Sequence, residues 1–109
     1  MTVGELQRHL QAELLVEGDL DRPVTGGYCG DLLSWVMGRA SAGDAWFSVI
    51  GNVNAIAVCV LADVACLVLC ENAVLDDAAR TRAETEAVTV LRSSRTAYDL
   101  AVALQKGLE

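Results

Sequence analysis

The sequence has few basic residues, only one histidine and only one proline, and these shortages exclude several functions. Eight Lys and Arg stand against fifteen Asp and Glu, which leaves a net charge of −7. Proteins that bind nucleic acid or an anionic membrane surface set several cationic side chains against phosphates, and no stretch of this chain concentrates them. His9 is the only histidine, so we expect neither a histidine metal set nor a serine triad. Nucleic acid and membranes are therefore not expected partners.

The N-terminus also lacks the basic start and apolar run of an export signal. The longest apolar run extends from Ala55 to Cys70 and is broken only by Asp63. As one helix it would span about 24 Å, short of a hydrocarbon core of about 30 Å. It would also place Asp63 near the membrane centre at a cost of about 3 kcal/mol. A buried helix followed by a buried strand explains the run better, and we expect a cytoplasmic protein.

The four cysteines include no C-x-x-C pair. Cys59, Cys66 and Cys70 fall within apolar runs, and Cys29 is distant from them in sequence. On a strand, Cys66 and Cys70 would lie about 13 Å apart, which is too far to share one metal. We expect buried free thiols, no metal site and no cofactor.

Hydrophobic residues, in contrast, make up 53% of the 109 residues. That is enough for one core without stabilising disulfides or metal ions, and the length suits one domain over residues 1–109. Leu20–Gly30 holds the only proline and three glycines, and we expect it to be irregular. N-cap residues and apolar spacing predict five helices: after Thr2, from Asp31, over Asn54–Ala62, from Asp76, and after Ser93 or Ser94. Short apolar runs predict strands over residues 14–16, 46–50, 65–70 and 88–91.

Two of these helices rest on particular signals. Thr2 and Glu5 have the spacing of a capping box. The segment Asn54–Ala62 is ambiguous, because its Val and Ile favour a strand while its length and flanks favour a helix. We predict a helix capped by Asn52 or Asn54.

Strands that alternate with helices of about ten residues indicate parallel strands joined by right-handed crossovers. The predicted fold is therefore α/β, a three-layer α/β/α sandwich with a mostly parallel sheet of four to five strands. The segment Ala55–Leu61 is apolar all round, and a helix of that kind must be covered on both sides. We expect it to form a homo-oligomer interface, with cover by a neighbouring loop as the alternative.

Several blocks of sequence carry a family resemblance. Asp21-Arg22 and Thr25-Gly26-Gly27 are followed by Gly30–Met37, Gly43–Trp46 and Asn54–Val58. Together these blocks resemble the DRTGG domain family, which is similar to the N-terminal domain of HPr kinase/phosphorylase. The resemblance implies a three-layer α/β fold, a tendency to oligomerise and a regulatory or ligand-binding role, but no activity. The chain has no G-x-x-x-x-G-K-[ST] loop, and it departs from the family at Cys29, where small residues are usual.

The stretch Thr25–Gly30 is the strongest candidate for a ligand site. Its glycines permit close backbone approach, and the first amides of the following helix can receive an anion. Asp31 at that helix end would repel phosphate, and the alternative is a glycine-rich turn that only connects two elements. The predicted ligand-binding residues are Thr25, Gly26, Gly27, Tyr28, Asp31 and Asn54. For Asp21, Arg22 and Asp44, surface or turn-stabilising roles compete with a role in the site.

Two functions from different classes follow. The first is a non-catalytic regulatory module that binds a small anion, for example an adenine nucleotide. The second is a structural or assembly protein that docks onto a partner such as a hydrogenase-related redox component, since some stand-alone members of the family are encoded near iron-only hydrogenase genes. An enzyme is not expected, because no nucleophile or acid–base pair stands out.

Overall fold

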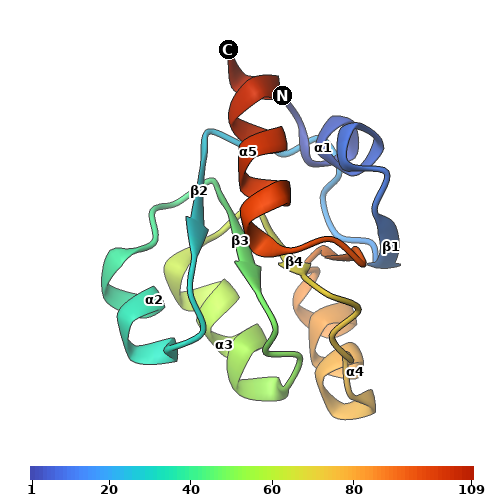
Figure 1. Ribbon diagram of the computed structural model, residues 1–109. Helices are drawn as coiled ribbons and strands as arrows, with labels where there is room; N and C mark the ends of the chain where they lie inside the picture. The colour runs from blue at the N-terminus through green and yellow to red at the C-terminus, as the bar shows by residue number, and fades with distance from the viewer.

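The computed structural model describes all residues, 1–109, as one chain of alternating helices and strands (Figure 1). In chain order the elements are α1 (Val3–Leu10), β1 (Glu13–Val16), β2 (Gly26–Cys29), α2 (Leu33–Arg39), β3 (Asp44–Ser48), α3 (Val53–Ala62), β4 (Cys66–Leu69), α4 (Asp77–Glu86), β5 (Val90–Arg92) and α5 (Ala97–Leu108).

The five strands form one sheet in the order β1-β5-β4-β3-β2. All neighbours are parallel except β1, which runs antiparallel to β5. Helices α1 and α5 cover one face of the sheet, and α2, α3 and α4 cover the other (Figure 1). The predicted three-layer α/β/α sandwich with a mostly parallel sheet is therefore confirmed.

Alternate residues of the central strands build a separate core on each face. Phe47 and Val68 pack beneath α1 and α5, whereas Trp46 and Leu67 pack beneath α2, α3 and α4. Strands β3 and β4 are buried along their whole length, as expected for parallel strands with helices on both faces.

Local capping signals were good guides to helix starts. The Thr2 hydroxyl accepts from the Glu5 amide at 3.1 Å, and Glu5 Oε1 accepts from the Thr2 amide at 3.0 Å, which confirms the capping box. Asn52 caps α3 through the Ala55 amide, and Asp76 caps α4. The ambiguous segment is therefore a helix, as predicted.

Two predicted caps are wrong. The Thr96 hydroxyl caps α5 by accepting from the Asp99 amide at 3.2 Å. Ser93 cannot do so because its backbone still extends the sheet, with its amide bonded to the Leu69 carbonyl. Helix α2 begins one residue later than an Asp31 cap requires, and its N-cap, Leu32, makes no side-chain bond.

The segment expected to be irregular contains a strand. Residues Gly26–Cys29 form β2, in parallel register with β3 from Asp44 to Phe47. Two glycines give little local preference for a strand, so pairing with β3 decides the conformation. The sheet therefore reaches five strands, with β2 at one edge.

Helix α3 is covered mainly by its own chain. Val58, in the middle of the segment expected to form a homo-oligomer interface, is 6% exposed and packs with Ile56 in the core, so it is not free to contact a second copy. Both ends of the helix stay open, with Val53 36% exposed at its start and Leu61 69% exposed near its end. None of the helices is both long and apolar enough to span a membrane.

Candidate functional site

A pocket of about 270 Å³ lies where β2, β3 and β4 end together, the edge at which open α/β sheets usually bind ligands. Its lining includes Asp31, Ser48 and Cys70, together with Ala97 from the first turn of α5. Asp31 Oδ1 accepts from Ser48 Oγ at 2.7 Å and from the Val49 amide at 3.0 Å. Asp31 therefore ties the end of β2 to the end of β3.

The charge of this pocket does not suit an anion. Asp31 and Glu71 are its only charged residues, and both are acidic. Burial and the nearby Asp31 charge raise the pKa of the Cys29 thiol, and burial raises the pKa of Cys70 to about 11. Both thiols are therefore protonated at neutral pH, and neither is an activated nucleophile.

The other predicted ligand residues do not gather at this pocket. Thr25 and Asp31 lie at opposite ends of β2, about 20 Å apart at the usual rise of a strand. Tyr28 points to the opposite face, where it packs against the core beneath α2 and α3. Asn54 is exposed in the first turn of α3. Of the six predicted residues, the pocket contains only Asp31.

The two glycines of β2 are needed for close packing. A Cβ at Gly27 would lie 2.9 Å from Leu104 Cδ2 of α5, and one at Gly26 would lie 2.8 Å from an Asp44 carboxylate oxygen. Asp44 also accepts from the Ser41 amide at 2.8 Å, which holds the turn before β3. The absence of a side chain at Gly27 therefore lets α5 lie close to the sheet.

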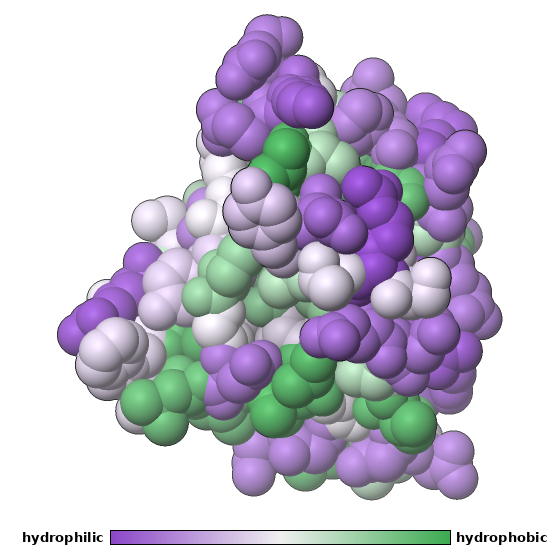
Figure 2. Space-filling view, in the orientation of Figure 1, coloured by the Kyte–Doolittle hydropathy of each residue, from purple (hydrophilic) through white to green (hydrophobic).

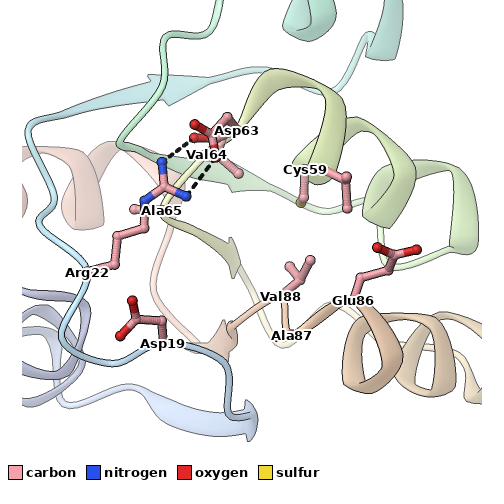
Figure 3. Close-up of a pocket in the computed structure, with 10 residues that line it drawn as sticks. Asp19, Arg22, Cys59, Asp63, Val64, Ala65, Glu86, Ala87 and Val88 are labelled. Atoms are coloured by element: carbon pink, nitrogen blue, oxygen red, sulfur yellow. Dashed lines mark hydrogen bonds and ion pairs between the residues drawn. The ribbon is translucent and has the colours of Figure 1, made fainter.

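Arg22 also has a structural partner. It lines a pocket of about 220 Å³ at the other end of the strands, where β4 and β5 begin (Figure 3). Its guanidinium donates to Asp63 Oδ1 at 2.8 Å and to the Asp63 carbonyl at 2.7 Å. The hydrogen bond from Arg22 and its positive charge hold the pKa of Asp63 below its ordinary value. The contact joins the loop before β2 to the end of α3, which favours the turn-stabilising interpretation of Arg22.

The remaining two pockets lie on the side of α1 and α5, and both include Arg95. One, of about 250 Å³, is lined by His9, Tyr98, Asp99 and Lys106 among others, so its two cations outnumber its one carboxylate. The other, of about 320 Å³, is lined by Ser93 and Ser94 and by the Glu13–Arg92 ion pair among others. Figure 2 shows hydrophilic residues gathered over this part of the surface, beside α5. Tyr98 is 77% exposed, so its ring is free for stacking.

The cations of this face stand out because they have no partner. Arg8, Arg95 and Lys106 make no side-chain hydrogen bond or ion pair, whereas the other basic side chains bind a carboxylate, a carbonyl oxygen or the Trp35 ring. Arg95 and Lys106 line the same pocket. This group was not predicted from the sequence, although Tyr98, Val102 and Lys106 recur every four residues along α5 and Arg95 lies three residues before Tyr98.

Three of the four cysteines are buried free thiols, as predicted, and Cys29 is the exception. Cys59, Cys66 and Cys70 are buried and free, and Cys29 is exposed and free. Burial raises the pKa of Cys59 and of Cys66 to about 12. No three His, Cys, Asp or Glu side chains come close enough to hold a metal ion.

Comparison with known proteins gives a structural match and no sequence match. No family model and no curated protein sequence matches the chain. Among solved structures, the fold is similar to the CBS and DRTGG domains of the regulatory region of Clostridium perfringens pyrophosphatase, crystallised with its activator diadenosine tetraphosphate. The TM-score is 0.71 at 13% identity, over 94% of this chain and 45% of the other.

This likeness defines the class of the protein as an α/β domain with a DRTGG-like fold. The chain corresponds to less than half of the pyrophosphatase region. At this level of identity the match establishes the fold alone.

Proposed function

We propose that the chain is a non-catalytic regulatory domain that binds a small anionic ligand, with an adenine nucleotide as the first candidate. The observation that carries the proposal is the unpaired Arg95, which lines two adjoining pockets and shares one of them with Lys106. The DRTGG-like fold supports the regulatory role, because the similar pyrophosphatase region is regulatory and binds a dinucleotide activator.

The α5 face supplies the contacts that a nucleotide needs. Arg95 and Lys106 are free to pair with phosphates, and an arginine can hold two phosphate oxygens at once. The exposed Tyr98 ring offers a surface on which a base can stack. Ser93 and Ser94 add hydroxyl groups at the other side of Arg95. The two pockets together reach the usual size of ligand sites, about 300–1,000 Å³.

The pocket at Asp31 is adjacent to this face. The Glu71 amide donates to the Arg95 carbonyl at 3.0 Å, and Glu71 and Ala97 line the Asp31 pocket. An uncharged part of a ligand that binds at Arg95 would be within reach of Asp31. The negative charge of Asp31 and Glu71 favours placing the phosphates at Arg95.

A binding screen tests the proposal. The probes are ATP, ADP, AMP, diadenosine tetraphosphate, tripolyphosphate and adenosine, measured by thermal shift and calorimetry. A ligand at one hundred times its Kd stabilises the folded state by about 2.7 kcal/mol, which should raise Tm by about 10 °C. Adenosine without phosphate should bind weakly, and higher salt should weaken the binding of every anion.

Two matched variants locate the site. Arg95→Ala should lower the affinity at least about tenfold, because it removes a charge-assisted contact. Arg82→Ala removes an exposed arginine of α4 that pairs with Glu86 at 3.4 Å, and it should leave the affinity unchanged. No stabilisation by any of the probes, or equal binding by the Arg95 variant, would refute the proposal. If the chain is instead an assembly protein that docks onto a partner, none of the probes should stabilise it.

A further inference from the structure

The two edges of the sheet differ in how they are protected. At the β1 edge the register with β5 shifts between Leu14 and Val16, and the Leu15 carbonyl accepts from Arg80 Nη1 at 2.7 Å. Glu13 pairs with Arg92 at 3.0 Å on the same strand pair. Bulges and charged side chains are the usual devices that prevent an edge strand from pairing with another chain.

The β2 edge has none of these devices. Its sequence, Gly26–Cys29, has no charge, no proline and no register shift against β3. The Gly30 amide donates to the Phe47 carbonyl of β3. Because N–H and C=O groups alternate between the two sides of a strand, those of Gly27 and Cys29 point away from the sheet. Both residues are exposed, so four backbone polar groups lie open.

Apolar side chains flank this edge. Leu32, Trp35 and Met37, on or next to α2, are 57%, 52% and 47% exposed. Figure 1 places α2 beside β2 at the outer side of the sheet, and Figure 2 shows a hydrophobic group at the lower left of the molecule, near the lower end of α2. An exposed group of this kind at a sheet edge is typical of an interaction surface.

The low charge of this surface allows a second copy of the chain to approach it. Residues 32–43 contain no acidic residue, and their one charge, Arg39, lies 3.6 Å over the Trp35 ring. In a chain with net charge −7, this is a surface at which two copies can approach with little repulsion.

We infer that two copies of this chain pair along β2. The strands run antiparallel across a two-fold axis, so that the sheets join into one. Gly27 and Cys29 of each copy then bond to the other copy, with Tyr28 nearest to the axis. Both α2 helices lie on the same face of the joined sheet, where Leu32 and Trp35 of one copy meet those of the other. Two outward residues alone offer few bonds to an extended peptide, whereas a second copy also covers the apolar side chains.

Sedimentation velocity on the full chain, over a range of concentrations, tests the inference. The unmodified chain should dimerise reversibly. Cys29→Pro removes an amide that points outward, which an edge strand tolerates, and should weaken the dimer at least about tenfold. Cys29→Ala keeps the amide and should dimerise like the unmodified chain. An unchanged circular dichroism spectrum shows that the proline variant is folded.

A second pair of variants addresses the apolar flank without altering the backbone. Trp35→Lys should also weaken the dimer at least about tenfold, because it places two like charges across the axis. Leu61→Lys, at the exposed end of α3, should leave it intact. A chain that stays monomeric at its highest soluble concentration would refute the inference. So would a dimer that is lost with Leu61→Lys and kept with Cys29→Pro and Trp35→Lys.

Discussion

Asp31 gives the sharpest test of how the carboxyl ends of the strands are held. Asp31→Ala removes two hydrogen bonds at once, from Ser48 Oγ at 2.7 Å and from the Val49 amide at 3.0 Å. Ser48 is 2% exposed, so its hydroxyl cannot turn to water. The Val49 amide lies at the surface and can be rehydrated.

The magnitude follows from that difference. A hydrogen bond to a charged group contributes about 1.5–3 kcal/mol. We assign about 1.5 kcal/mol to the buried Ser48 bond and about 0.5 kcal/mol to the exposed Val49 bond. Asp31→Ala should therefore lower the free energy of unfolding by about 2 kcal/mol, and lower Tm by about 8 °C.

Urea denaturation of two variants measures the effect. Asp31→Asn keeps an oxygen in the same place and should lose less than about 1 kcal/mol, since the acceptor is then neutral. Both variants should keep the m-value of the unmodified chain. Equal losses in Asp31→Ala and Asp31→Asn would refute the assignment of the stability to these two bonds. If the phosphates bind at Arg95, Asp31→Ala should also leave their affinity nearly unchanged.

Three other predictions follow from the structure. Gly51→Ala should lower the free energy of unfolding, measured in urea, by about 3 kcal/mol or more, because its Cβ would overlap a backbone carbonyl oxygen. Gly38→Ala, in α2 with open space around it, should raise the free energy of unfolding by up to about 1 kcal/mol. Similar values for the two variants would contradict this. Arg22 holds the pKa of Asp63 below its ordinary value of 3.8, so its contribution is full above that value and is lost as the pH falls through the lowered pKa. The stability gap between the unmodified chain and Arg22→Gln should then be constant near neutral pH and should shrink below about pH 4, and a gap that widens in acid would contradict the ion pair. A thiol reagent should modify Cys29 first in the folded chain and the three buried thiols only after unfolding, and rapid reaction of all four would contradict their burial.

Much of the fold could be predicted from the sequence, because its signals are local. Thr2 with Glu5, Asn52 and Asp76 are caps whose partners lie three residues away, so the spacing alone predicts them. The apolar run 65–70 predicts a buried parallel strand without any knowledge of its neighbours. The alternation of such segments predicts the three-layer sandwich.

The tertiary structure decided what depends on residues distant in sequence. Gly26–Cys29 becomes a strand because β3 is there to pair with it. Asp31 bonds to the end of β3, seventeen and eighteen residues along the chain, rather than to its own helix.

The candidate site belongs to the same class of features. His9 joins Arg95, Tyr98 and Lys106 only because α1 packs beside α5, where His9 Nε2 lies 2.8 Å from the Ala103 carbonyl oxygen. Hydrogen bonds within one turn depend on spacing that a sequence displays. A pocket or a strand pairing depends on which elements become neighbours, and only the packing of all the helices and strands determines that.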